Sequence, residues 1–184
     1  KVDDALMVFH QYVGDNDPDK QKKLDQLKMD AAWVYFKDLK FKQAEEIMRD
    51  LNFDAHEFLA LFKNISPKNI FENKANITFS SLFQEASKRV SADSELRKDQ
   101  NNAMKPVREF LANILENRRK YFSEKNQKEY PEFITSDEFS PFADDIRARK
   151  FMKLTVEEHL AIIDYALLNI YLDLQKADPL NTLL

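Results

Sequence analysis

Apolar residues recur at the spacing of an α-helix between positions 156 and 174. One row follows alternating steps of four and three residues and consists of Val156, Leu160, Ile163, Leu167, Ile170 and Leu174. Such a row lines one face of a helix. A second apolar row lies on another side and consists of Ile162, Tyr165, Leu168 and Leu172. We therefore expect neighbouring helices to cover this segment on two sides, as in a bundle or a stack of helical repeats.

The ends of this helix carry signals of their own. Thr155, followed by Glu158 three residues later, matches the capping box that opens helices, and Asp178-Pro179 ends the pattern. Glu, His, Asp and Asn interrupt the apolar run, whereas a membrane span needs about 20 mostly apolar residues. We expect a buried helix here and no transmembrane segment.

The same periodicity predicts earlier helices at about 1–13, 19–39, 41–51, 54–62, 80–90 and 94–125. Asp17, with Pro18, and Asp54 stand where N-cap residues would open two of them. The break at 38–40 is so short that its two flanking helices should pack as an antiparallel hairpin. Pro106 lies inside the longest helix, where we expect a kink and not a fresh start, because Lys105 is a poor cap.

Two stretches lack a sustained helical period and are predicted to be connections. Residues 63–78 form the first, in which we expect four apolar side chains to dock on neighbouring helices: Ile65, Ile70, Phe71 and Ile77. Residues 127–150 form the second, a long connection with one short helix at about 141–150.

Glycine is almost missing from the chain, and this narrows the possible folds. Gly14 is the single glycine among 184 residues. A P-loop, a dinucleotide-binding GxGxxG and a GxSxG nucleophile elbow each need at least two glycines, so these motifs are absent. Hairpins with glycine turns are nearly excluded as well. The sequence therefore predicts an all-α fold, with room for one compact domain or for several stacked helix pairs.

Charge and cysteine content limit the partners and the compartment. The net charge is −4 and both signs are interspersed, so there is no basic surface of the kind that nucleic acid requires. The absence of cysteine excludes disulfides and cysteine-based zinc sites and fits a reducing compartment. Because the first residue is Lys1 and no signal-like segment follows, we expect a piece of a longer protein.

The residue types that carry catalysis or bind metals occur in the chain without the spacing that either function needs. His10, His56 and His159 are far apart in sequence and match neither HExxH nor ExxH, so we interpret them as surface or capping histidines and expect no metal and no cofactor. The carboxylate pairs are neighbours that point about 100° apart on a helix, which favours solvated faces over catalysis. They are Glu45-Glu46, Asp144-Asp145 and Glu157-Glu158. No catalytic residue is predicted.

Two basic clusters could each have a binding role or a structural role. The cluster Arg118-Arg119-Lys120 could bind a phosphate or an acidic partner, but we favour a helix C-terminus whose dipole the charges complement. A second cluster, Arg147, Arg149 and Lys150, is interpreted as a solvated face.

Asp164 could be a buried switch, but a solvent-facing position is favoured. Trp33, with Tyr35 and Phe36, could be a peptide-binding hot spot, but core packing between hairpins is preferred.

Three segments resemble one protein family. Residues 33–62, WVYFKDLKFKQAEEIMRDLNFDAHEFLALF, are similar to the clathrin-type helical repeat of vacuolar sorting subunits, and residues 104–121 resemble the helix that follows it. Residues 159–172, HLAIIDYALLNIYL, resemble the vacuolar sorting protein 39 and TGF-beta receptor-associated protein family. They match it at Ile163-Asp164, Ala166-Leu167-Leu168 and Tyr171-Leu172. The chain departs from the family after Asp54, where Ala55 replaces the usual proline, and at 62–67.

The resemblance implies an α-solenoid of stacked helical hairpins over residues 1–184, similar to clathrin heavy chain or TPR repeats. Residues 1–75 would belong to the clathrin-type repeat and 76–184 to a family-specific helical part. It also implies a non-enzymatic scaffold in a subunit of the HOPS or CORVET tethering complexes, on the cytoplasmic side of endosomal, lysosomal or vacuolar membranes. The implied partners are the other tethering subunits and, through the parent protein, a Rab GTPase; membrane association would be peripheral.

Two other functions stay open at this point. The family's second name implies an adaptor that binds TGF-beta-type receptors or Smad proteins. An isolated helical-bundle enzyme is the third hypothesis, although no catalytic constellation in the sequence favours it. The sequence does not identify the surface that binds a partner.

Overall fold

The fold is that of a computed structural model, which describes residues 4–5, 7–9, 17–62, 64–65, 77–89, 100–125, 133–136, 138–142 and 154–175. Within these ranges every regular element is a helix, and one isolated β-bridge pairs Phe53 with Ile134. The predicted all-α class is therefore confirmed. None of the described helices is both long enough and apolar enough to cross a lipid bilayer.

The helices follow the predicted order. They are α2 (Lys20–Lys37), α3 (Phe41–Met48), α4 (His56–Leu59), α5 (Phe79–Arg89), α7 (Gln100–Lys125) and α9 (Val156–Asp173). Residues 4–5 and 7–9, in the first predicted segment, are also helical. Helix α4 is shorter than predicted because the backbone tightens after it: Leu61 and Phe62 donate to carbonyls three residues back, those of Phe58 and Leu59.

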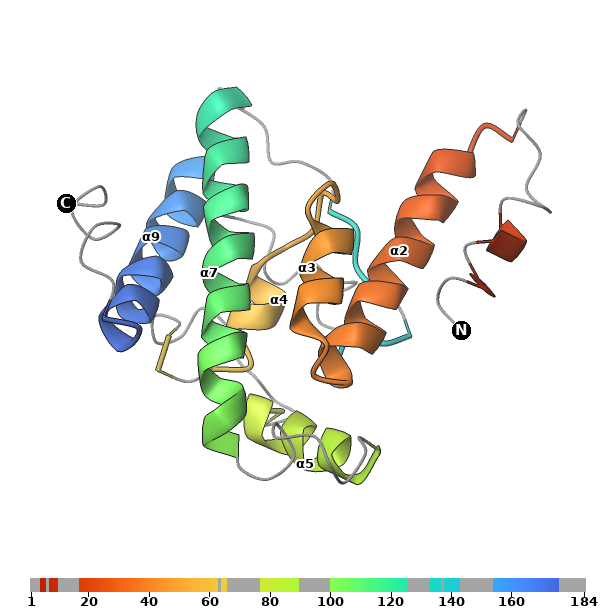
Figure 1. The fold of residues 1–184 in the computed structure, drawn as a ribbon. Coiled ribbons are helices and arrows are strands. Elements are labelled where there is room, and N and C mark those ends of the chain that lie inside the picture. The colour runs from red at the N-terminus through yellow and green to blue at the C-terminus, as the bar shows by residue number, and fades with distance from the viewer. Residues whose placement is uncertain are drawn as a thin grey trace.

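Helices α2 and α3 pack side by side, as their short connection predicts (Figure 1). The chain reverses at Leu39, whose φ of 61° lies in the left-handed region that glycine normally occupies. The amide of Lys40 then donates to the carbonyl of Tyr35 and closes the end of α2. Leu39 is buried, so contacts of its side chain offset the cost of this conformation.

Four helices form a row. Figure 1 shows α2, α3, α7 and α9 side by side, and the main contacts between helices join α2 to α3, α3 to α7 and α7 to α9. Helix α5 lies across the end of the row where α7 begins, and α4 lies behind α3 and α7. Neighbour-to-neighbour packing is typical of stacked helices. The finer expectation, a solenoid of repeated hairpins, stays a prediction.

Helix α7 runs from residue 100 to 125 without a break at Pro106. The prediction of one helix is therefore confirmed over the described part, 100–125, and the kink stays a prediction. Proline removes one backbone hydrogen bond and so destabilises the helix. Burial of apolar side chains in the following turns offsets this loss of stability. Those side chains are Val107, Phe110, Leu111, Ile114 and Leu115.

Aromatic side chains form the centre of the core. Trp33 is fully buried, stacks on Phe58 with ring centroids 4.3 Å apart, and meets Phe36 edge-on at 5.6 Å. Phe110 of α7 reaches the same cluster, 5.3 Å from Phe36. Such offset and edge-to-face contacts add to the burial of apolar area. Core packing, the preferred interpretation of Trp33, is confirmed.

The expectation that helix α9 is covered on two sides is met only in part. Ile163, Leu167 and Ile170 of the first row are buried. In the second row Ile162 is buried and Leu168 is half-buried. Tyr165, however, is 45% exposed and Leu172 is 58% exposed. Periodicity shows which residues share a face but not whether a neighbour covers that face.

The predicted capping box at the start of α9 is present. Thr155 Oγ1 accepts the amide of Glu158 at 3.1 Å, and Glu158 Oε2 accepts the amide of Thr155 at 2.7 Å. Replacing Thr155 with alanine is expected to lower the free energy of unfolding by about 1 kcal/mol, because a helix amide loses its partner. Urea unfolding measures this loss. Thr155→Ser keeps the hydroxyl and should stay near wild type; equal losses in both variants would contradict the role of the cap.

The predicted connections are described in part. Ile65 is buried and Ile77 packs against the core, as expected, while Ile70 and Phe71 lie outside the described residues. In the second connection the described residues, 133–136 and 138–142, contain no helix, and most of the short helix expected at 141–150 lies outside them. The segment is anchored by its backbone, since Ile134 donates to the Asn52 carbonyl at 2.8 Å.

Candidate functional site

Polar and charged side chains are buried around α4, where the fold brings four segments together. Seven of the described residues are both polar and buried: Asp54, His56, Glu57, Arg118, Ser136, Ser140 and His159. They come from α4 and the turn before it, from α7, from the 133–142 segment and from α9. Charged groups are rarely buried without specific partners, so this region is the candidate functional site.

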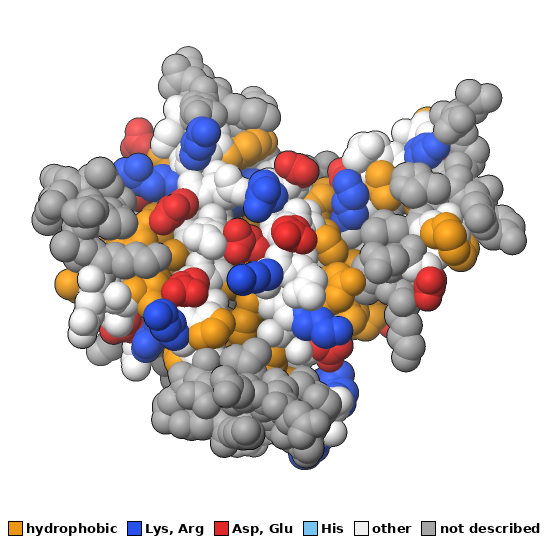
Figure 2. Space-filling view, in the orientation of Figure 1, with side chains coloured by type: hydrophobic (Ala, Val, Ile, Leu, Met, Phe, Trp, Pro, Cys, Tyr) orange, Lys and Arg blue, Asp and Glu red, His pale blue; other side chains and the backbone are white. Residues whose placement is uncertain are grey.

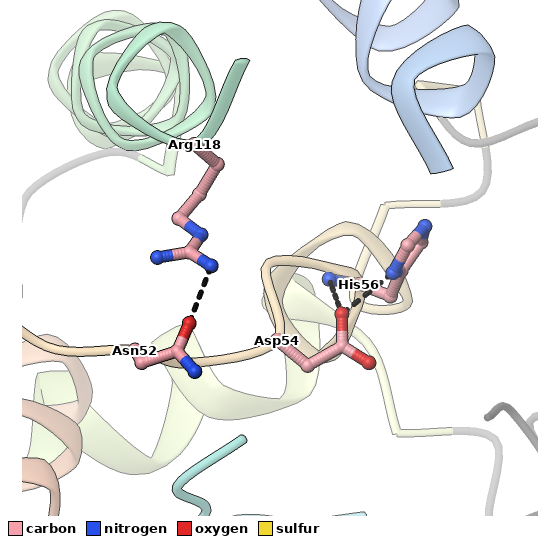
Figure 3. A network of polar contacts seen from close by, with 4 residues as sticks. All are labelled: Asn52, Asp54, His56 and Arg118. Carbon is pink, nitrogen blue, oxygen red and sulfur yellow. Dashed lines mark hydrogen bonds and ion pairs between the residues drawn. The ribbon is translucent and has the colours of Figure 1, made fainter. Parts of the chain in front are cut away.

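Asp54 and His56 form a buried pair at the start of α4. Figure 3 shows one carboxylate oxygen of Asp54 directed at both the backbone and the ring of His56. Oδ1 accepts the amide of His56 at 3.0 Å and lies 2.6 Å from the ring nitrogen Nδ1. Burial alone would raise the pKa of Asp54, but the charge of His56 and its hydrogen bonds outweigh burial and lower the pKa to about 2. Asp54 is therefore an anion at neutral pH.

His159 of α9 lies against this pair. Its ring centroid is 4.2 Å from that of His56, at an interplanar angle of 73°. Phe122, 4.6 Å away, and Phe133, 5.9 Å away, enclose the imidazole. Burial, reinforced by the nearby charge of His56, lowers the pKa of His159 to about 3, so this ring is neutral at pH 7.

The interpretation of these histidines as surface or capping residues is wrong for two of the three. His56 and His159 are both buried, and His10 lies outside the described residues. A signal for His159 was present in the sequence: it stands four residues before Ile163 and seven before Ala166, on the apolar face of the helix. For His56 no local signal exists, because its burial depends on contacts with α9.

Glu57 is the second buried carboxyl of the region. Ser140 donates its hydroxyl to Glu57 Oε2 at 2.7 Å, which ties α4 to the 138–142 segment. Burial raises the pKa of Glu57 to about 8, against the opposing effect of the bond from Ser140. Glu57 therefore holds its proton at neutral pH, in contrast to Asp54 three residues earlier.

Arg118 is buried in α7 and does not sit at a helix end. Its guanidinium donates to the Leu51 carbonyl at 3.3 Å. It also donates to Asn52 Oδ1 at 2.7 Å (Figure 3). Four aromatic rings surround the same group, with centroids 4.5 to 5.6 Å from Cζ: Phe53, Tyr121, Phe122 and Phe133. The expected pairing with the dipole at a helix C-terminus is wrong for this residue, because α7 continues to Lys125. Arg118 instead packs in the core, where its guanidinium makes cation–π contacts.

Arg118→Lys is expected to lower the free energy of unfolding by about 1–3 kcal/mol. Lysine keeps the charge but lacks the planar fork that reaches two oxygens, and its ammonium is costlier to dehydrate among aromatic rings. Chemical denaturation would measure the change. Arg119→Lys is the matched control, because Arg119 is 40% exposed and its ion pair with Asp164 lies at the surface. A loss at Arg119 as large as that at Arg118 would contradict the argument.

The remaining candidates lie away from the cluster. Asp164 is partly exposed, as favoured, and its Oδ1 lies 2.6 Å from Nε of Arg119, an ion pair that joins α9 to α7. Glu46 and Glu157 are exposed, Glu45 accepts from Asn113, and Glu158 belongs to the capping box. Three charged groups lie outside the described residues: Asp144-Asp145, Arg147 with Arg149, and Lys150. The described carboxylate pairs thus have structural or solvated positions.

The cluster offers one kind of chemistry that the sequence pattern did not suggest. Asp54, His56 and His159 can each supply one ligand atom, and these atoms lie within 4.8 Å of one another. Two imidazoles and a carboxylate are a common ligand set for transition metals.

Comparisons with protein families, with curated proteins and with solved structures found no match to this chain.

Proposed function

We propose that this chain is a non-enzymatic scaffold segment of a HOPS- or CORVET-type tethering subunit, which acts at endosomal, lysosomal or vacuolar membranes through protein contacts. The observation that carries the proposal is the resemblance of residues 159–172 to the vacuolar sorting protein 39 and TGF-beta receptor-associated protein family. A Rab GTPase and the other tethering subunits are the proposed partners.

The position of the matching residues supports this proposal. Ile163, Ala166, Leu167 and Tyr171 are all buried, and Tyr171 donates its hydroxyl to Glu116 of α7. Two ion pairs border the same interface: Arg119 with Asp164, and Arg108 with Asp173 at 2.9 Å. Most of the matching residues therefore lie on the buried side of α9, which is what a shared scaffold would preserve, whereas Leu172 is exposed.

The charge pattern of the described surface argues against nucleic acid as the partner. Figure 2 shows Lys and Arg interspersed with Asp and Glu across the face formed by α3 and α7. Such a mixed face lacks the single-sign charge that steers nucleic acid. A groove of about 490 Å³ between the end of α3 and α7 is lined by both signs as well, including Arg49, Asp50 and Lys120.

Affinity capture tests the proposal. The tagged parent protein, with and without residues 1–184, is recovered from cell extract and its partners are identified by mass spectrometry. Recovery of tethering subunits by the intact parent is the expected result, and their loss on deletion would locate a binding surface in this segment. Recovery of a receptor cytoplasmic domain or a Smad protein, without any tethering subunit, would overturn the proposal in favour of the adaptor function.

A further inference from the structure

We propose that Asp54, His56 and His159 form a binding site for one divalent transition metal ion of the zinc class, which would join α4 to α9. This inference goes beyond the proposed function and does not rest on it. It starts from the placement of the three side chains, which come from two distant parts of the chain and are all buried, with exposed fractions of 2%, 1% and 0%.

The geometry is close to that of a coordination site. Zinc binds imidazole nitrogen and carboxylate oxygen at about 2.0 to 2.2 Å, so two ligand atoms on one ion lie at most about 4 Å apart. The three candidate atoms lie within 4.8 Å of one another. Closure of the site therefore needs only small side-chain movements, and no change in the path of α4 or α9.

The donor set selects the class of ion. Two imidazoles with one carboxylate suit zinc, cobalt or iron, whereas calcium and magnesium prefer oxygen ligands alone. Three protein ligands leave a further position for water, and this number is usual for zinc sites that are not closed by four side chains.

The surroundings fix the ligands in place. The backbone amide of His56 donates to Asp54 Oδ1 and so orients the carboxylate, an outer contact of the kind that positions metal ligands. Phe122 and Phe133 pack on His159 and reduce access of water, which strengthens electrostatic attraction at the site. An ion would replace the contact between Asp54 Oδ1 and His56 Nδ1, and would balance the buried carboxylate charge from a position shared with His159.

Arg118 is the nearby group that acts against a cation, since its guanidinium is buried in α7 among the same phenylalanines. Its N–H groups donate to the carbonyl of Leu51 and to Asn52 Oδ1, and in Figure 3 the guanidinium points to Asn52 and not to Asp54. The negative charge of the buried Asp54 carboxylate offsets the repulsion between Arg118 and a bound cation.

Metal loading tests the site directly. The purified chain is unfolded in EDTA, refolded with equimolar Zn²⁺ or Co²⁺, dialysed and examined by native mass spectrometry. We expect one ion per chain and, with Co²⁺, visible ligand-field bands of a four-coordinate site. A correctly folded wild-type chain that retains no ion would overturn the proposal and leave Asp54 and His56 as a hydrogen-bonded pair only.

Variants locate the ion. His159→Gln and Asp54→Asn should each weaken Co²⁺ affinity at least tenfold, whereas His10→Gln, which removes the third histidine of the chain, should leave affinity unchanged. Loss of binding in the His10 variant with retention in the other two would place the ion elsewhere and refute the site. If a cluster variant fails to fold, proton NMR of the Co²⁺-loaded wild type decides, because signals from two imidazoles must be strongly shifted.

Discussion

Replacing Trp33 with alanine is expected to lower the free energy of unfolding by about 3–5 kcal/mol. The indole is fully buried, stacks on Phe58 of α4 and contacts Phe36 edge-on. Its removal leaves a cavity between α2 and α4. The two helices can close this cavity only in part, because their packing against the rest of the core limits how far they can move. Because domains are stable by about 5–15 kcal/mol, this loss would remove a large share of the total stability.

Urea unfolding followed by circular dichroism measures this effect. Leu172→Ala is the matched control: it also shortens a large apolar side chain on a helix, but Leu172 is 58% exposed, so the expected change is within about 0.5 kcal/mol. A Trp33 variant as stable as the Leu172 variant would contradict the central place of the aromatic cluster in the core.

The helices were predictable because their signals are local. Amphipathic spacing, the hairpin break at 38–40 and the capping box at Thr155 depend on residues a few positions apart, and the structure bears out each of them. The end of helix α4 was less predictable, because it is set by backbone hydrogen bonds between residues three apart, from Phe58 to Phe62. Exposure was the other failure: Tyr165 and Leu172 share an apolar row, yet a sequence pattern does not show which rows find a neighbour.

The candidate site was not predictable from spacing. His56 and His159 meet only because α9 packs beside α4, and a motif of fixed spacing cannot describe such a pair. Arg118 was misassigned for the same reason: its partners are Asn52 and the carbonyl of Leu51, which precede it by more than sixty residues. Composition and periodicity report on single elements, whereas buried polar groups are decided by contacts between elements.

Folding stability is expected to depend on pH in two opposite directions. In metal-free protein with EDTA, the pKa of His159 is about 3 when folded against 6.5 ordinarily, and that of Asp54 is about 2 against 3.8. The unfolded chain binds more protons at these groups, so stability falls as pH decreases from 6.5 towards 2. The pKa of Glu57 is raised from 4.5 to about 8, so the folded chain binds the extra proton and stability falls as pH rises from 4.5 to 8.

The sum of these effects is a plateau with two falling sides. Each group contributes a slope of about 1.4 kcal/mol per pH unit within its own window. Between pH 4.5 and 6.5 the slopes of His159 and Glu57 cancel. Below pH 4.5 His159 acts alone until Asp54 joins it at about pH 3.8, and a loss of about 3 kcal/mol is expected by pH 3. Between pH 6.5 and 8 Glu57 is the one of these three groups that still contributes, and it lowers stability by about 2 kcal/mol.

Glu57→Gln isolates the alkaline side. Glutamine can still accept the hydroxyl of Ser140 but does not titrate, so the stability of this variant should stay level from pH 6.5 to 8 and should rise from pH 4.5 to 6.5, where His159 is no longer opposed. Denaturant midpoints at half-unit pH steps provide the curve, with exposed Glu46→Gln on α3 as the control that keeps the wild-type shape. An alkaline fall that survives in the Glu57 variant would show that another group causes it, and that this carboxyl does not hold a proton in the folded chain.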